Sequence, residues 1–380
     1  MLLDLNQILH ELHAHPETGF NETWTSDYLS RKFRDFGLQV FENIAKTGFA
    51  AILPGRDRSR AVGYRADMDA LPIREQTDLP WASQNGCMHA CGHDVHMTVA
   101  LGIAHELAAA PEAPECDVVF VLQPNEEGAP GDLPSGAELM CREGVLDRFG
   151  IRRMLALHCD PGLEIGKFGV CRGAVWAASG RFTVQVSGKS AHAAYPERGR
   201  DALWAASEMV TAIYSAIQRQ RPAASEVVSV CKLNAGTAFN VIAGQAQFEG
   251  IMRGPSRQNL IELGEIIRNT CQNVARYCQV EADYQQFWGA NAVINDDELT
   301  QIALDTWQPS GVAQMIQMSM ASEDFSHFSE RIPCFYAMLG IRPHDASMCA
   351  PLHADNFIAD ESVIPGAIHQ MTALIRRLMN

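Results

Sequence analysis

The first half of the chain alternates between two patterns of apolar residues. Short apolar runs bounded by turn signals predict four buried strands. These runs cover residues 48–53, 61–64, 116–123 and 153–157. Helical spacing is present over residues 2–36, with a break near His15-Pro16, and again over 95–110, where Asp94 is the expected N-cap. Strands that alternate with helices predict an α/β domain with a largely parallel sheet.

The middle of the chain has a different order of elements. Phe182, Val184 and Val186 alternate as on one face of a strand. Further strands and helices follow in the order β-α-β-β-α-β, which is the ferredoxin-like unit. We therefore predict an α/β fold in which residues 178–288 form an inserted domain. Residues 1–177 and 289–380 would form a mixed-sheet α/β/α domain.

Composition restricts the partners and the compartment. A chain of 380 residues suits two domains. Its formal net charge of −15 disfavours binding to nucleic acid or to anionic membranes, and no apolar stretch is long enough to span a bilayer. The start shows no signal-peptide pattern. Eleven scattered cysteines without a Cys-x-x-Cys pair favour a reducing, cytoplasmic location over a disulfide framework.

The densest polar cluster spans residues 89–96. It holds three histidines, His89, His93 and His96, together with Cys91, at the mouth of a predicted helix. Cysteine thiolate and neutral imidazole are the usual ligands of zinc-like ions. Any one of these side chains alone would be interpreted as a core or capping residue, but the cluster predicts a metal site.

Acidic and imidazole side chains also follow the predicted strands. Glu126 and Glu127 come just after the strand at 116–123, His158 after 153–157, and Asp67 and Asp69 after 61–64. Ligands in open α/β sheets bind beyond the carboxyl ends of the strands. Adjacent carboxylates can divide the work, since one can bind metal while the other acts as general base.

Three other polar positions carry less information from spacing alone. His353 and His192 would each be interpreted as a surface or structural histidine. Glu323-Asp324 is typical of a solvated helix start.

Several motifs together resemble one family, the amidohydrolase branch of the aminoacylase-type co-catalytic metallopeptidases. This branch includes hippurate hydrolases, auxin-conjugate hydrolases and N-acetyl-diaminopimelate deacetylases. The similar segments are His89–Asp94, Gln123–Gly128, His15-Pro16-Glu17 with Glu22 and Thr25, Tyr64–Pro72, Ser190–Pro196, Ala238–Ile242, Ser322–Phe325 and Leu352-His353.

The resemblance implies a role for each matching residue. The implied metal ligands of two divalent ions, Mn²⁺ or Zn²⁺, are Cys91 as the bridge, His93, Glu127, His158 and His353. It also implies that Glu126 is the general base and that Asp69 orients the site. His192 would stabilise the tetrahedral intermediate, in its own or a partner subunit, and Asn240 and Arg253 would hold the substrate carboxylate.

The implied activity is hydrolysis of small N-acyl amino acids to a carboxylic acid and a free amino acid. The implied assembly is a homodimer or higher homo-oligomer through the middle domain, which would act as a lid. The chain departs from the family pattern at the long turn 130–135, at Ala243 and Ala321, and at Ile251-Met252-Arg253, which lacks a frequent threonine. None of these is an implied metal ligand, so the departures leave the implied metal chemistry intact and bear on substrate selectivity instead.

Other functions stay open on the sequence. A metallo-dipeptidase or carboxypeptidase would use the same metal chemistry. A hydrolase with Cys91 as nucleophile would need only a base, not five scattered metal-type residues. A non-catalytic metal-binding protein would not need Glu126 beside the ligands.

Overall fold

A computed structural model describes residues 3–128, 133–221, 225–343 and 350–379. The chain divides into two compact units. Unit 1 comprises Met1–Val175, Ile294–Gln317 and Asp324–Asn380, and unit 2 comprises Trp176–Val293 and Met318–Glu323. Part of the long turn after Glu127, residues 129–132, lies outside the described residues.

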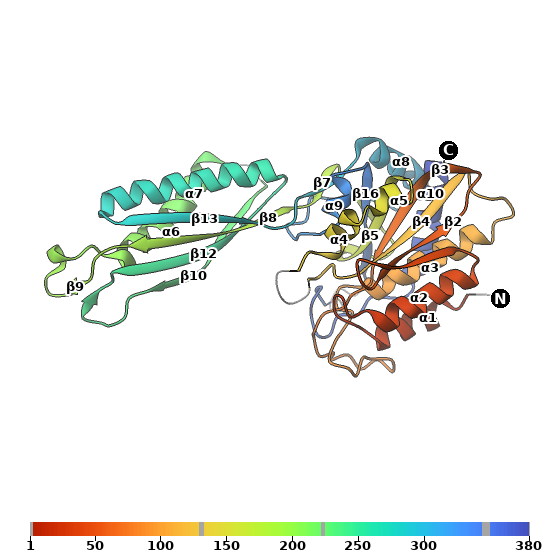
Figure 1. The fold of residues 1–380 in the computed structure, drawn as a ribbon, viewed down its shortest axis with the longest axis horizontal. Helices are drawn as coiled ribbons and strands as arrows, with labels where there is room; N and C mark the ends of the chain where they lie inside the picture. Colours follow the sequence, from red (N-terminus) through yellow and green to blue (C-terminus); the bar gives the residue numbers. More distant parts are fainter. Residues whose placement is uncertain (1–2, 129–132, 222–224, 344–349, 380) are drawn as a thin grey trace. The chain divides into compact units, whose positions relative to one another are not determined.

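Unit 1 is built on a mixed eight-stranded sheet (Figure 1). Its order is β1-β2-β4-β3-β5-β16-β6-β15. The strands are β1 (Gln39–Ile44), β2 (Gly48–Leu53), β3 (Asp57–Asp67), β4 (Cys116–Gln123), β5 (Ile151–Glu164), β6 (Phe168–Val170), β15 (Ala313–Met315) and β16 (Cys334–Arg342). The central strands β4, β3, β5 and β16 run parallel. The mixed-sheet α/β prediction is thus confirmed.

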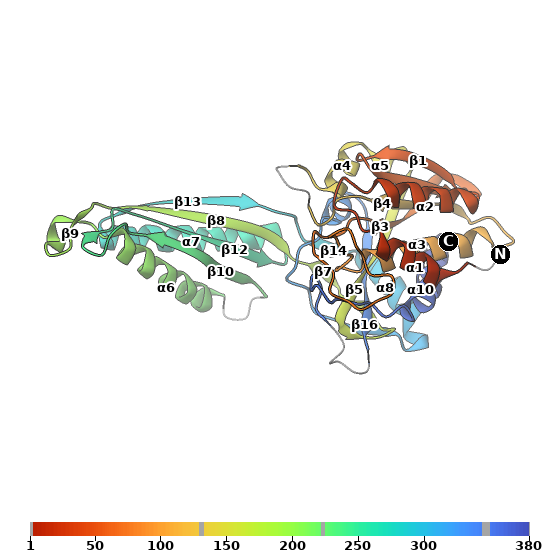
Figure 2. The ribbon, with the colours of Figure 1, turned by 90° about the horizontal axis from the view of Figure 1, so that it is seen from below.

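Helices cover both faces of this sheet (Figure 2). On one face lie α1 (Leu5–Ala14), α2 (Thr23–Asp35), α3 (His93–Ala108), α8 (Asp297–Trp307) and α10 (Val363–Met379), and on the other α4 (Gly136–Arg142), α5 (Val145–Arg148) and α9 (Ser326–Ser329). All eight residues of β4 are buried, as expected for a strand covered on both faces. Helix α3 is buried almost all round, because it packs on β3 and β5 and is covered by α1, α2 and α10.

Two local predictions about unit 1 were wrong. Helix α3 begins at His93, and its N-cap is Gly92 rather than Asp94. Asp94 lies in the first turn, where it accepts hydrogen bonds from Val95 N and His13. Strand β5 does not end before His158 but continues to Glu164. Its register with β3 runs only to Ala156, however, and beyond that point Cys159 N donates to His96 of α3.

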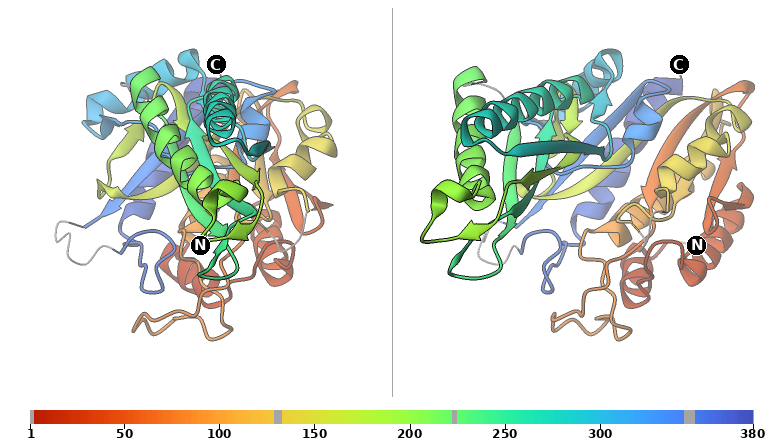
Figure 3. Two further views of the ribbon diagram at one scale, coloured as in Figure 1. Left: turned by 90° about the vertical axis from the view of Figure 1, so that its left-hand side faces the viewer. Right: turned by 60° about the vertical axis from the view of Figure 1, so that its left-hand side comes forward.

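Unit 2 contains a four-stranded antiparallel sheet of order β10-β12-β8-β13. Two helices pack side by side on one face of it (Figure 3). The elements follow one another as β8 (Ala178–Ser187), α6 (Ala202–Gln220), β10 (Val227–Ala235), β12 (Gln245–Gly254), α7 (Arg257–Cys278) and β13 (Glu281–Trp288). Phe182, Val184 and Val186 are all buried, because alternate residues of β8 face the helices.

Short elements complete the chain. They are β7 (Gly173–Trp176), paired with β14 (Val293–Asn295), β9 (Ala191–His192), paired with β11 (Val241–Ile242), and the 3₁₀ turns Pro196–Arg198 and Gln308–Ser310. Among the described residues, none of the helices has the length and apolar character needed to cross a membrane.

Candidate metal-dependent active site

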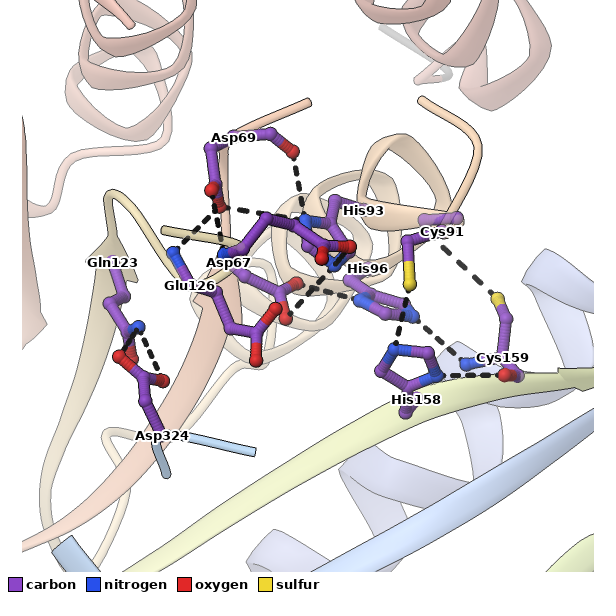
Figure 4. Close-up of polar contacts among 12 residues, drawn as sticks. Asp67, Asp69, Cys91, His93, His96, Gln123, Glu126, His158, Cys159 and Asp324 are labelled. Atoms are coloured by element: carbon purple, nitrogen blue, oxygen red, sulfur yellow. Dashed lines mark hydrogen bonds and ion pairs between the residues drawn. The ribbon is translucent and has the colours of Figure 1, made fainter. Parts of the chain in front are cut away.

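Cys91 and His93 stand on either side of Gly92 at the N-terminus of α3. Gly92 has a φ of +84°, and a Cβ atom there would lie 2.9 Å from Cys159 Sγ. Only glycine adopts this left-handed backbone freely and leaves room for the neighbouring strand. The sharp turn brings the Cys91 thiol and the His93 imidazole toward one centre (Figure 4).

Donor atoms from distant parts of unit 1 meet at Cys91. His158 Nε2 lies 3.4 Å and His353 Nε2 3.3 Å from its Sγ. Glu127 Oε1 lies 3.2 Å from His353 Nε2 and 4.0 Å from His93 Nε2. Two of the groups of donor atoms that lie within 4.8 Å of one another contain this sulfur, Cys91-His93-His158 and Cys91-Glu127-His353. The two groups share only the sulfur, which is the arrangement expected of a bridging ligand.

Backbone carbonyls orient two of these imidazoles. His93 Nδ1 lies 2.8 Å from Asp69 O, and His158 Nδ1 lies 2.7 Å from Cys159 O. A carbonyl can only accept, so each Nδ1 carries a proton. The Nε2 of each ring is then the atom that can face a cation: on His158 it presents a lone pair, and on His93 a cation would displace the proton that the nearby carboxylates favour. His93 Nε2 is buried and has no hydrogen-bond partner in the described part of the chain. A bound cation would satisfy it.

The electrostatics of the cluster also favour cations. Burial lowers the pKa of His158 to about 3, so its imidazole is neutral. Burial raises the pKa of Glu127, but the His353 hydrogen bond and the charge of His93 outweigh it and lower that pKa to about 2. Burial opposes a charge on His93 too, yet Asp67 and Asp69 raise its pKa to about 10. The carboxylates thus attract positive charge, and a neutral imidazole and an ionised carboxylate are both suitable ligands.

Asp69 fixes the backbone that carries the paired glutamates. Its Oδ1 accepts from Glu126 N and its Oδ2 from Glu127 N, each at 3.0 Å. Its main-chain carbonyl accepts from His93, as described above. One buried aspartate therefore connects the turn after β4 with the first turn of α3. Oxygen atoms of Glu126 and Glu127 lie within 4.8 Å of a ring nitrogen of His93.

A buried network behind the donors was not predicted from the sequence. Arg65 Nη1 donates to Asp67 Oδ2 at 2.6 Å, its Nη2 donates to Asp324 Oδ1 at 3.1 Å, and its Nε donates to Gln123 at 2.9 Å. The Asp67 carboxylate also lies 2.7 Å from His96 Nδ1, and His96 Nε2 accepts from Cys159 N. Figure 4 shows the Asp67–His96, His96–Cys159 and Gln123–Asp324 contacts of this network.

The prediction of a solvated helix start at 323–324 was wrong, since Glu323 and Asp324 are 2% and 6% exposed. The available signal was Arg65, a cation inside an apolar strand pattern, which requires a buried partner. The sequence could not identify that partner because Asp324 is distant along the chain.

His353 reaches the centre from the loop before α10. Its N–H donates to Ala90 O at 2.8 Å, and its φ is +66°. The hydrogen bond to Glu127 raises the pKa of His353 against its burial. Its side chain remains 52% exposed, so this donor forms the solvent side of the cluster.

The other predicted substrate-contacting residues lie in unit 2. His192 and Asn240 are exposed neighbours, since Ala193 N donates to Asn240 O and Val241 pairs with His192. Arg253 lies at the far end of β12, opposite Ser179. It is separated from Gln245, where that strand begins, by about 26 Å at the usual rise of 3.3 Å per residue. Unit 2 therefore does not bring Arg253 together with His192 and Asn240.

The α/β fold and the donor cluster at the ends of its parallel strands define a class, a metal-dependent hydrolase whose donor set suits two cations. The sequence pattern of peptidase family M20/M25/M40 matches residues 63–377, and the chain belongs to this family. The family resemblance seen in the motifs is thereby confirmed.

Curated relatives and a solved structure agree with this assignment. The chain is 32% identical to an N-acetyldiaminopimelate deacetylase of Ligilactobacillus salivarius over 98% of its length and 96% of that protein's. It is 33% identical to a hippurate hydrolase of Campylobacter jejuni over 88% of both chains. The structure of Bacillus subtilis YXEP protein, a dinuclear metal-binding peptidase of the M20 family, is similar with a TM-score of 0.85 and 29% identity, covering 99% of this chain and 97% of that one.

Proposed function

We propose that this protein hydrolyses N-acyl amino acids to a carboxylic acid and a free amino acid, with two divalent cations, Mn²⁺ or Zn²⁺, per subunit. The observation that carries the proposal is the pair of donor groups that share Cys91, with the Glu126 carboxylate beside them. Hippurate and N-acetyldiaminopimelate, which appear in the names of two relatives, are both N-acyl amino acids.

The site residues of unit 1 divide into metal ligands, a general base and a residue that positions the paired glutamates. Cys91, His93, Glu127, His158 and His353 hold the cations, which would supply an activated water and polarise the acyl carbonyl. Glu126 accepts the proton of the attacking water and delivers it to the amine nitrogen as the C–N bond breaks. Asp69 keeps Glu126 and Glu127 in place through their backbone N–H groups.

Unit 2 would act as the lid and complete the site. His192 would donate to the oxyanion of the tetrahedral intermediate, and Asn240 and Arg253 would hold the substrate carboxylate. Because Arg253 lies at the opposite end of the sheet from His192 and its neighbour Asn240, we propose that His192 and Asn240 act on the partner subunit's site, while Arg253 acts in its own. The edge strand β10, with Val227, Val228 and Val230, offers an apolar edge for a homodimer.

The location we propose is the cytoplasm. The ten cysteines in the described segments are all free thiols, as a reducing compartment would keep them.

The thiol environment argues against Cys91 as a catalytic nucleophile. Burial and the charges of Glu127 and Glu126 raise the pKa of the Cys91 thiol well above its ordinary value. A nucleophilic cysteine needs a depressed pKa and a base, whereas this thiol ionises readily only next to a cation.

The test is a screen of the purified, metal-reconstituted protein against acetyl, benzoyl and indole-acetyl amino acids, with dipeptides as competitors. We expect release of free amino acid that stops on addition of chelator and returns with Mn²⁺ or Zn²⁺. Turnover of dipeptides alone would replace the proposal with a metallo-dipeptidase. Activity that survives complete metal removal would restore the cysteine-nucleophile hypothesis.

A further inference from the structure

The turn that carries Glu126 and Glu127 has an unusual backbone. Asn125, a non-glycine residue, has a φ of +52°. The left-handed region is unfavourable for L residues, by about 1 kcal/mol, although asparagine tolerates it better than most. Surrounding contacts must therefore hold this turn in place.

Three consecutive N–H groups of the turn point at two buried carboxyl groups. Glu126 N and Glu127 N donate to Asp69, and Asn125 N donates to Glu22 Oε1 at 2.9 Å. On the other side of the turn, Gly136 N donates to Asn125 O at 3.0 Å. Asp69 thus holds the two glutamates, while Glu22 holds the residue that sets their direction.

Glu22 is 0% exposed, and both of its oxygens have partners, since Thr47 Oγ1 donates to Oε2 at 2.5 Å. It occupies the N-cap position of α2 but makes no side-chain capping bond. Glu17 caps that helix instead, with bonds from Trp24 N at 3.1 Å and Thr25 N at 2.9 Å. Helix capping therefore does not explain a buried acid at position 22.

We infer that Glu22 is a positioning residue for the reaction, because its buried carboxyl group holds the Asn125 N–H and so fixes the turn that presents Glu126 and Glu127. This inference rests on the proposed function. Two features of the turn require such an acceptor. Asn125 is 1% exposed, so its N–H has no access to water, and its left-handed backbone has to be held by surrounding contacts.

The environment of Glu22 indicates which substitution should preserve the role. Burial and the charge of Asp69 raise the pKa of Glu22 to about 7. A neutral group is thus tolerated among the nearby carboxylates. Glutamine has the same shape and offers an oxygen to Asn125 N and an NH₂ to Thr47 Oγ1. Methionine has similar volume but no strong acceptor.

The experiment compares Glu22→Met, Glu22→Gln and the matched control Glu17→Met in the full-length protein. Zn²⁺ affinity of the metal-free protein is measured by competition with a chromogenic chelator, and kcat and KM are measured on an N-acyl amino acid that the wild type hydrolyses. We expect Glu22→Met to lower Zn²⁺ affinity and kcat by about 10–100-fold, because Glu127 and Glu126 lose their alignment. KM should change little, and Glu22→Gln should restore both quantities.

Glu17→Met should destabilise α2 but leave both quantities unchanged. Glu22→Ala takes the place of the methionine variant if the latter does not fold. Wild-type affinity and kcat in Glu22→Met would overturn the inference, as would equal impairment of the glutamine variant or of Glu17→Met. If the wild type hydrolyses no N-acyl amino acid, the proposed function fails, and the Zn²⁺ titration alone still decides the role of Glu22.

Discussion

Arg65 and Arg58 both lie on β3 and form ion pairs of similar length. The two arginine side chains differ in burial. Arg65 is 0% exposed and lies 2.6 Å from Asp67, whereas Arg58 is 52% exposed and lies 2.8 Å from Asp117. Replacing each arginine with methionine keeps an unbranched apolar stem and removes the charged guanidinium. If distance set the energy, the two variants would lose similar stability.

Burial predicts a large difference between them. Arg65→Met leaves Asp67 and Asp324 without their buried cation, which typically costs about 3–5 kcal/mol. Arg58→Met removes an ion pair whose arginine is half-exposed to water, and Asp117 keeps the hydrogen bond from Gly55 N, so the loss should be about 0–1 kcal/mol. Bound metal would partly replace the lost positive charge beside Asp67, since His93 Nε2 lies 3.6 Å from its Oδ2. The loss should therefore be larger in metal-free protein.

The assay is urea unfolding of both variants and the wild type, with chelator and with saturating Zn²⁺. We expect Arg65→Met to shift the metal-free midpoint strongly and Arg58→Met hardly at all. Equal, small losses in the two variants would refute the view that the buried Arg65 network supports the metal centre.

Four further predictions use other parts of the chain. Glu126→Gln should keep both metals but lose nearly all turnover, and substantial activity measured in a metal-saturated assay would remove it as the base. Cys91→Ala should lower the metal content per subunit, measured by atomic emission, while an unchanged stoichiometry would exclude sulfur as a ligand. Mixing inactive His192→Ala with inactive Glu126→Gln should regain activity in hybrid dimers if His192 serves the partner, and no recovery after subunit exchange would place it in its own site. Burial lowers the pKa of His13, but hydrogen bonds to Asp94 and Glu75 outweigh this and raise that pKa to about 10. The contribution of His13 to stability is therefore complete below pH 6.5 and is lost as the pH rises through about 10. The wild type should lose more urea resistance than His13→Gln over that pH range, and parallel curves for the two proteins would contradict this.

Elements set by local pattern were predicted well from the sequence. The apolar run 116–123 coincides with β4, and the strand predicted at 48–53 coincides with β2. The prediction stopped β5 too early, because its extension is stabilised by pairing with β16, a partner far along the chain. No strand was predicted at β16 itself, although eight of its nine residues are buried.

The candidate site likewise contains residues with a local sequence signal and residues without one. Cys91 and His93 are recognisable because they are neighbours at a helix start. His353 carries no local signal, and only the family resemblance pointed to it. The Arg65–Asp324 contact and the Glu22–Asn125 contact join segments whose proximity depends on the order of strands in the sheet. Such pairings cannot be read from local spacing, since they follow from topology.

The proposed function rests on Cys91 as the ligand that two cations would share. The most direct test is an anomalous difference map from crystals of the zinc-loaded protein, recorded at the zinc edge. We predict two peaks per subunit, each about 2.3 Å from Cys91 Sγ, one beside His93 and His158 and the other beside Glu127 and His353. A single peak, or two peaks of which one lacks contact with Cys91, would contradict the account.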